Sequence, residues 1–321
     1  IFMNHKSIIK FTKKSFFIIS FIFAIIITIL SSLNIIKYPL YKDYYSNLTK
    51  LCKNPGLNED YIPQGITFFD NKIITVGYMK NQTNSRIYVI DSKTNEEKHF
   101  KLISNGKDFL GHTGGIQYLN GFLYLADEGT GIYKIPINSL NKNSSTTIDI
   151  GTPTKVNSNS SFVFGRDNYL YVGEFHRNTD YECTNIIEHN GKINYAIVEK
   201  YNVNDFTTPV EIYSIPDQIQ GFCIKNDGTI ILSSSWGISS SKFYIYEPES
   251  VIKTRQSYNN SEVFFLDEPT KTIKAPAMSE DLDIIFENDN SETILTMFES
   301  ASNQYFYGKF FFATYIAKLD F

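Results

Sequence analysis

The strongest regularity in this sequence is a short pattern that occurs five times after residue 60. In each copy an apolar run is followed by a two-residue turn and then by a second apolar run. Consecutive copies begin 50, 46, 60 and 60 residues apart, and their first residues are Gln64, Gly114, Ser160, Gln220 and Glu280. Turns such as Asn120-Gly121 and Asp227-Gly228, placed between apolar runs, are the strongest short signal for a β-hairpin. The chain therefore repeats a hairpin unit.

A third apolar run follows each hairpin, and four of the five units have a candidate fourth. These fourth runs begin near Lys98, Ser145, Pro209 and Ser261. Four antiparallel strands per unit, repeated around an axis, make a β-propeller. The 22 Tyr and 26 Phe residues suit such a strand-rich chain. We therefore expect an all-β fold in which residues 61–321 form a β-propeller of five blades, with six as the alternative.

The last unit raises a problem of closure. The sequence given ends on the third strand of the fifth unit, which would leave an exposed sheet edge. The segment from Tyr44 to Leu57, within the predicted linker 37–60, is the only material that the repeats do not use. We predict that this segment supplies the missing strand and closes the ring from its N-terminal side.

An apolar segment precedes the repeats. Ser15 to Ile36 contains 22 residues without a charge, which is long enough to cross a bilayer. Four lysines lie before it, and lysines mark the cytoplasmic side, so residues 1–14 are predicted to be cytoplasmic and 15–36 to be a single transmembrane signal anchor. The predicted location is the cell membrane, with the propeller outside the cytoplasm. A cleaved signal peptide is the rival interpretation.

Composition excludes several function classes. The formal net charge is −4, which gives no basic surface for nucleic acid. Three cysteines, Cys52, Cys183 and Cys223, have neither the spacing of a zinc module nor the number of a disulfide scaffold. No Walker loop, dinucleotide fingerprint or nucleophile elbow is present.

Propeller geometry predicts where a ligand would bind. The start of each first strand and the end of each second strand open on the same face, near the central axis. On that face the repeats gather polar residues, namely Gln64, His112, Asp127, Glu128, Glu174, Gln220, Glu280, Asp281 and Glu299. We expect Gln64, Glu128, Gln220 and Trp236 to bind a small-molecule or glycan ligand, with Trp236 stacking on a sugar or a base. The long loop from Phe175 to Ile193 would act as a lid, or would be a solvated insertion.

The carboxylates of this face raise the possibility of a metal. Several oxygen ligands converging on one axis suit Ca²⁺, and Glu174, Glu280 and Glu299 are the predicted ligands. His112 would then act as a general base beside the cation. The opposing interpretation is that these carboxylates are simply solvated at loop tips.

Five phrases in the repeats carry a family resemblance. They are Tyr61-IPQGI, Gly111-HTGGI, Ile219-QGF, Pro276-AMSED and Phe298-ESAS. As a set they resemble a family of secreted or membrane-anchored bacterial β-propellers without an assigned activity. Their general pattern is also similar to the gluconolactonase and senescence-marker-protein propellers, which implies a metal-dependent hydrolase on six blades. This chain shows five repeats, and the metal ligands of that family do not match residue by residue.

Two functions are consistent with these observations. The first is a membrane-anchored extracytoplasmic module that binds a ligand on an acidic central face. The second is a calcium-dependent hydrolase of small esters, lactones or phosphoesters. A cation with an open coordination position beside His112 would distinguish the hydrolase from the binding module.

Overall fold

The computed structural model describes residues 5–141, 146–305 and 313–321, and within the N-terminal helix it describes the side chains of residues 13–29, 39 and 40. The chain divides into two compact units, residues 1–42 and 43–321. Helix α1 (His5–Leu40) makes up most of the first unit, and the short helix α2 (Lys42–Ser46) follows. All strands belong to the second unit.

The predicted N-terminal helix is present as part of α1. Within the described residues, no helix has both the length and the apolar character that crossing a membrane requires. The structure therefore does not support the transmembrane span predicted over 15–36. The side chains of residues 30–38 lie outside the described part, and the membrane location stays a prediction.

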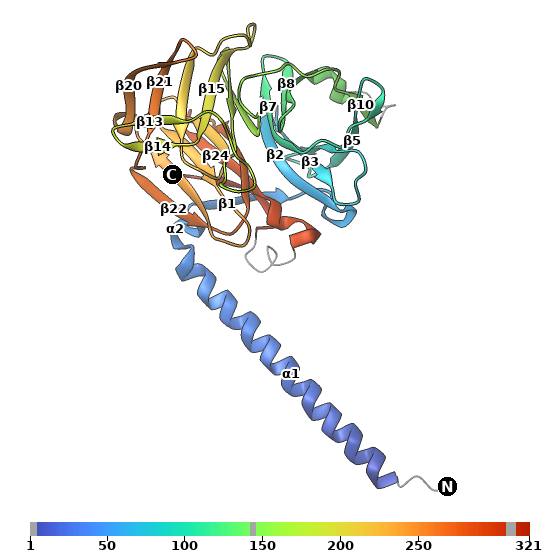
Figure 1. Cartoon of the computed structure of the whole chain (residues 1–321). Coiled ribbons are helices and arrows are strands. Elements are labelled where there is room, and N and C mark those ends of the chain that lie inside the picture. Colours follow the sequence, from blue (N-terminus) through green and yellow to red (C-terminus); the bar gives the residue numbers. More distant parts are fainter. Residues whose placement is uncertain (1–4, 142–145, 306–312) are drawn as a thin grey trace. The chain divides into compact units, whose positions relative to one another are not determined.

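Across the residues that the structure describes, the second unit is a β-propeller of five blades (Figure 1). Blade one contains β2 (Tyr61–Phe69), β3 (Lys72–Met79), β4 (Arg86–Asp91) and β5 (Glu97–Ser104). Blade two contains β7 (Thr113–Leu119), β8 (Phe122–Asp127) and β9 (Gly131–Pro136). Blade three contains β11 (Phe162–Arg166), β12 (Tyr169–Gly173), β15 (Ala196–Asn202) and β16 (Glu211–Ile215).

The remaining two blades complete the ring. Blade four contains β17 (Ile219–Ile224), β18 (Ile230–Ser234), β19 (Ser241–Tyr246) and β22 (Lys271–Ala275). Blade five contains β23 (Ser279–Phe286), β24 (Glu292–Phe298), β25 (Tyr315–Leu319) and β1 (Leu48–Lys53). The innermost strands β2, β7, β11, β17 and β23 contact one another in that order, and β23 contacts β2. The prediction of five blades is confirmed.

Glycines allow the innermost strands to approach closely. A Cβ atom on Gly65 would lie 2.6 Å from the backbone nitrogen of Ile116, and one on Gly115 would lie 2.7 Å from that of Val163. Both glycines follow a bulge in their strand pair. In the fifth blade Asp281 occupies the equivalent position, and its Oδ2 accepts hydrogen bonds from the backbone of Ile66 and Ile116, both at 3.2 Å. The glycines of the Gln64-Gly65 and Gly114-Gly115 pairs thus allow neighbouring innermost strands of the ring to pack closely.

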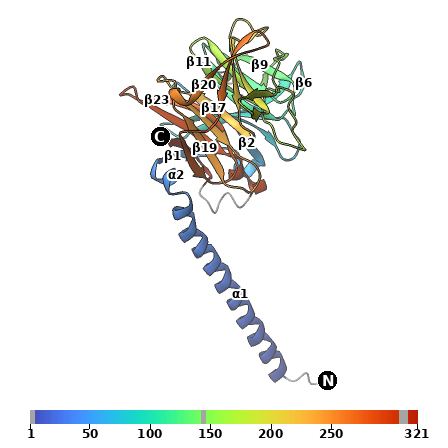
Figure 2. The same ribbon diagram turned by 60° about the vertical axis from the view of Figure 1, so that its left-hand side comes forward.

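The ring closes from the N-terminal side, as predicted. Strand β1, which lies within the segment 44–57, pairs antiparallel with β25 and supplies the fourth strand of blade five (Figure 2). Its Cys52 packs with Ile316 and Leu295 of the same blade and with Ile66 of blade one. The segment therefore joins both the sheet and the apolar core.

Two of the predicted fourth strands are wrong. The run near Ser145, itself outside the described residues, continues into β10 (Thr147–Asp149), which pairs in parallel with β5 of blade one. The run at Ser261 forms β21 (Ser261–Leu266), which pairs in parallel with β16 of blade three, while β22 completes blade four. The outer edges of blades one and three thus each pair with a strand from a later stretch of the chain, which covers an edge that would otherwise be unpaired.

The apolar core lies between the blades. Ile74 and Val89 of blade one pack with Ile116 and Leu125 of blade two in one cluster. A second cluster joins blades two and three in the same way, and a third joins blades one and five. Because each blade packs its faces against its neighbours, the polar axis is left as the place for a site.

Candidate functional site

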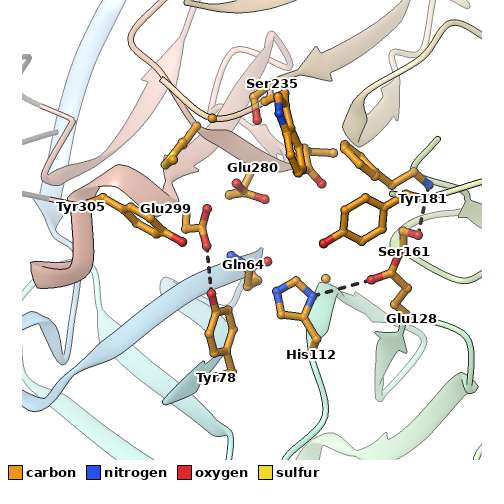
Figure 3. Close-up of a pocket in the computed structure, with 16 residues that line it drawn as sticks. Gln64, Tyr78, His112, Glu128, Ser161, Tyr181, Ser235, Glu280, Glu299 and Tyr305 are labelled. Atoms are coloured by element: carbon orange, nitrogen blue, oxygen red, sulfur yellow. Dashed lines mark hydrogen bonds and ion pairs between the residues drawn. The ribbon is translucent and has the colours of Figure 1, made fainter. Parts of the chain in front are cut away.

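A cavity of about 310 Å³ opens on the face that the repeats predict (Figure 3). Gln64, Gln220 and Glu280 reach it from the starts of innermost strands, and Tyr78, Glu128 and Glu299 reach it from the ends of second strands. His112, which precedes β7, lines it too. Side chains that are far apart in the sequence thus meet at the axis because the blades repeat one geometry.

Blade three departs from this pattern by one residue. Ser161 and Phe175 line the cavity, whereas Ser160 and Glu174 do not. Since neighbouring residues of an extended chain point to opposite sides, this offset turns the Glu174 side chain away. Its carboxyl group is buried, where it accepts hydrogen bonds from Asn185 Nδ2 at 2.5 Å and from the backbone of Asn159 at 3.2 Å. Burial raises the pKa of Glu174 to about 7.

Two glutamates form the acidic centre of the cavity. Glu280 is 2% exposed, and burial, with the charges of Glu299 and Asp281, raises its pKa well above the usual value. No hydrogen bond from a described residue offsets this effect. Burial also raises the pKa of Glu299 to about 7, although hydrogen bonds with Tyr78, Gln64 and Tyr305 oppose the rise. Because the two carboxylates would repel each other, the pair retains a proton at neutral pH.

Tyr78 positions one member of this pair. Its phenolic oxygen donates a hydrogen bond to Glu299 Oε1 at 3.1 Å and so links blade one to blade five (Figure 3). Its ring also lies 4.7 Å from the imidazole of His112, measured between ring centroids. Glu299 begins a short 3₁₀ helix, Glu299–Ala301, directly after β24. The end of β24 and the end of β3 therefore meet in the cavity.

His112 and Glu128 form the second polar contact of the cavity. His112 Nδ1 lies 3.9 Å from Glu128 Oε2. Burial lowers the pKa of His112, whereas burial and the charge of Asp127 raise the pKa of Glu128. A histidine with a lowered pKa is neutral at pH 7, so this contact brings little positive charge to the acidic face.

Aromatic rings form the opposite wall. Trp236 lies 5.9 Å from Phe175 and 5.8 Å from Tyr181 between ring centroids, and Tyr305 closes another side of the cavity. The Arg177 guanidinium covers the Trp236 ring at 4.2 Å and is paired with Asp180. Sequence reasoning named Trp236 but not Tyr181 or Tyr305. Tyr181 lies in the predicted lid loop, and only that location hinted at its role.

The predicted calcium ligands can be compared with the side-chain clusters of the described residues. In the parts of the chain that the structure describes, no three His, Cys, Asp or Glu side chains gather closely enough to hold a metal ion. Of the predicted ligands, Glu280 and Glu299 share the cavity and Glu174 does not line it. The structure therefore gives the calcium prediction no support.

No protein-family model matches the sequence, and no curated protein matches it significantly. Among solved structures, it is similar to the PQQ-bound form of aldose sugar dehydrogenase from Streptomyces coelicolor, with a TM-score of 0.44, 10% identity and coverage of 78% of this chain and 76% of that one. Glutaminyl cyclase from Myxococcus xanthus has a TM-score of 0.43 and 8% identity, and the alignment covers 85% of this chain and 94% of that one. The WD40 propeller domain of Doa1 has a TM-score of 0.40 and 10% identity, with coverage of 85% of this chain and 96% of that one. At these values the similarity concerns the β-propeller fold alone. The expected family is therefore not assigned.

Proposed function

We propose that the propeller is a binding module whose axial cavity takes a small polar molecule bearing a cationic amine. The observation that carries this proposal is the buried pair Glu280 and Glu299, both with a raised pKa. Among the described residues that line the cavity none is lysine or arginine. Buried acidic groups are costly unless a charge or hydrogen-bond donors compensate them, and an ammonium group supplies both.

The aromatic walls support the same ligand. Tyr78, Tyr181, Trp236 and Tyr305 line the cavity around the carboxyl groups. Ammonium groups are attracted to the faces of such rings, and because the Arg177 guanidinium already covers the Trp236 ring, the tyrosine rings carry this argument. An anion would meet the three carboxyl groups of Glu128, Glu280 and Glu299 and only a neutral histidine, so it would bind poorly.

The N-terminal helix belongs to this proposal as well. We propose that α1 anchors the chain in the cell membrane and that the propeller binds its ligand outside the cytoplasm. The four lysines before the apolar segment support that orientation. The alternative function, a calcium-dependent hydrolase with His112 as the base, requires a metal centre, and no observation in the described residues favours it.

The test is binding of simple amines to the full chain. Ethanolamine, choline and glucosamine would be compared with the neutral ethylene glycol and N-acetylglucosamine by thermal shift and calorimetry. We expect saturable binding of the amines alone, because only they place a positive charge beside Glu280. Glu280→Gln should weaken binding about tenfold, which corresponds to the loss of one charge-assisted contact.

A matched carboxylate serves as the control. Glu249 is exposed and lies in the 3₁₀ helix Pro248–Ser250, away from the cavity lining. Glu249→Gln should bind amines as the unaltered chain does. Equal binding of amines and neutral analogues, or unchanged binding by Glu280→Gln, would overturn the proposal.

A further inference from the structure

A second cavity of about 570 Å³ borders the first one. Ser235 and Trp236 line both cavities, so the two spaces meet at these residues. Its other walls come from blades three and four and from the chain before β15, and they include Asn194, Tyr195, Asp217, Gln218, Lys242 and Tyr244. The two cavities are therefore neighbours, with Ser235 and Trp236 as their common border.

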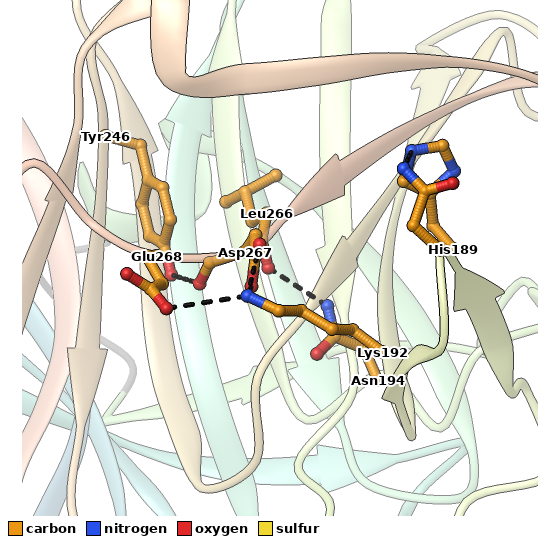
Figure 4. Close-up of polar contacts among 8 residues, drawn as sticks. His189, Lys192, Asn194, Tyr246, Leu266, Asp267 and Glu268 are labelled. Carbon is orange, nitrogen blue, oxygen red and sulfur yellow. Dashed lines mark hydrogen bonds and ion pairs between the residues drawn. The ribbon is translucent and has the colours of Figure 1, made fainter.

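One wall of the second cavity is fixed by polar contacts. The hairpin of β13 (Ile187–His189) and β14 (Lys192–Asn194) is tied to the loop after β21 (Figure 4). Lys192 Nζ lies 2.7 Å from both carboxyl oxygens of Asp267, and Asn194 Nδ2 donates to the backbone oxygen of Leu266 at 3.1 Å. Tyr246 also donates to the backbone oxygen of Asp267, at 3.2 Å. These contacts hold Asn194 where it borders the cavity.

The wall around Gln218 is fixed as well. The backbone nitrogen of Gln218 donates to the oxygen of His176 at 2.9 Å, and its own oxygen accepts from Ser235 at 3.0 Å. The ring of Tyr195 stacks on His176 at 5.1 Å between centroids. Binding in such a preformed space loses little conformational freedom.

The chemistry of the second cavity differs from that of the first. Hydroxyl groups of serine and tyrosine and side-chain amides dominate its lining, which also contains one lysine, Lys242, and one carboxylate, Asp217; its aliphatic residues are Ile193 and Pro216. Groups that both donate and accept hydrogen bonds fit a ligand covered with hydroxyl groups. Lys242 and Asp217 bring one charge of each sign to the lining, so the space has no excess charge and suits uncharged hydroxyl and carbonyl groups.

We propose that the two cavities form one site for an oligosaccharide, in which an amino sugar occupies the acidic cavity and a neutral sugar occupies the second. This inference rests on the proposed function, since the amine is assigned to Glu280 and Glu299. Trp236 lies at the junction, where its indole contacts both sugar units.

A peptide with a free amino terminus is the alternative ligand, because it also carries an amine on an extended chain. A bound peptide usually pairs its backbone with an open strand edge. The strands of blade four that border the second cavity, β18 and β19, are paired on both sides, in the order β17-β18-β19-β22. Side-chain hydroxyl and amide groups therefore dominate recognition there, which favours a sugar over a peptide.

The chain offers a direct optical probe, because Trp236 is its only tryptophan. The probes are glucosamine, a disaccharide of glucosamine β-1,4-linked to N-acetylglucosamine, its fully N-acetylated counterpart, and triglycine. Titration of the full chain should show a change in tryptophan emission with the amine-bearing disaccharide. That disaccharide should bind about tenfold more tightly than glucosamine, since a second unit adds a few hydrogen bonds.

Variants of the second cavity separate the two sugar units. Lys242→Ala and Tyr244→Phe should lower affinity for the disaccharide towards that of glucosamine and leave glucosamine binding unchanged. The control is Lys134→Ala, because Lys134 is also an exposed lysine on a third strand, 4.2 Å from a phenylalanine ring, and lines neither cavity.

The outcomes distinguish this inference from the proposed function. Equal affinity for glucosamine and the disaccharide, or tighter binding of triglycine, would overturn the inference while the amine pocket stands. Tighter binding of the fully acetylated disaccharide than of the amine-bearing one would overturn both. A loss of disaccharide binding in Lys134→Ala equal to that in Lys242→Ala would also contradict the assignment of the second cavity.

Discussion

Leu48 lies opposite Leu319 in the register of β1 and β25, so the strand that precedes blade one completes the blade in which the chain ends. The pairing continues to Lys53 opposite Tyr315, with one irregularity between Lys50 and Cys52. Five sheets can form a ring only if the first and the last are joined. This pairing joins them at blade five, in addition to the packing of β23 on β2.

The first prediction concerns this closure. Deleting residues 48–53 from the full chain should expose the edge of β25 and remove Cys52 from the core. We expect the unfolding midpoint to fall by about 10 °C, or the protein to aggregate, because a flat unpaired edge recruits other chains. Thr49→Ala, which keeps the backbone pairing of an exposed position, should change the midpoint by about 2 °C at most. Equal midpoints for the deletion variant and the unaltered chain would contradict ring closure by β1.

The hairpins could be predicted from sequence because their signals are local. Turn pairs such as Asn120-Gly121 carry the positive φ angles that a tight turn needs, 51° and 84° here. The outer strands could not be placed in this way. The alternation of polar and apolar residues in β21 indicates a strand, but nothing in its residues says whether it joins blade three or blade four. Its partner depends on which edge is open after the ring has formed.

The residues of the site could be predicted wherever the repeat fixes which side chains point to the axis of the ring. Gln64, Glu280 and Glu299 reach the cavity because blades one and five follow the common register, and Gln220 does so at the start of blade four, where Ser235 rather than Ser234 lines the cavity at the end of the second strand. Glu174 does not, because an offset of one residue in blade three reverses the direction of the side chain. Such an offset leaves no mark in the spacing of apolar residues, so only the structure shows it.

The second prediction concerns the crowded axis. Gly115→Ala should destabilise the propeller by about 3 kcal/mol, because its Cβ would lie 2.7 Å from the backbone nitrogen of Val163 and backbone cannot move aside at low cost. Gly121→Ala is the control, since nothing lies within 4 Å of its Cβ and only the strain of a φ of +84° remains, about 1 kcal/mol. Chemical unfolding measures both. A smaller effect at Gly115 than at Gly121 would refute the role of close strand packing.

The third prediction concerns the pH dependence of stability. The pKa of Glu299 is raised to about 7 in the folded chain, above the value of about 4.3 for an unfolded glutamate. The folded state therefore keeps a proton that the unfolded state loses, so this group's stabilising contribution is complete below about pH 4.3 and is lost as pH rises to about 7. The loss should amount to about 4 kcal/mol.

Urea unfolding of the unaltered chain and of Glu299→Gln at several pH values tests this prediction. Other buried carboxyl groups with a raised pKa, Asp283 and Glu174, are present in both proteins, so the difference between the two proteins reports the titration of Glu299 together with its effect on Glu280, whose pKa the Glu299 charge raises. The free energy of unfolding of Glu299→Gln should rise relative to that of the unaltered chain between pH 4.5 and pH 7.5. A difference that stays constant over this range would show that Glu299 titrates normally.

The last prediction links the same proton to the ligand. A cation beside Glu280 and Glu299 favours their ionised forms, so binding lowers the pKa of the pair and releases a proton. Affinity should therefore rise with pH by up to about tenfold per unit below the pKa of about 7 of Glu299, and should level off above it. Choline is the suitable probe because its charge does not change with pH, so any dependence comes from the protein. Calorimetry at pH 6, in two buffers of different ionisation enthalpy, should show net release of protons, and Glu299→Gln should release fewer. Choline affinity that is flat between pH 5 and pH 8, with no proton released, would mean that the cation does not bind at this carboxyl pair.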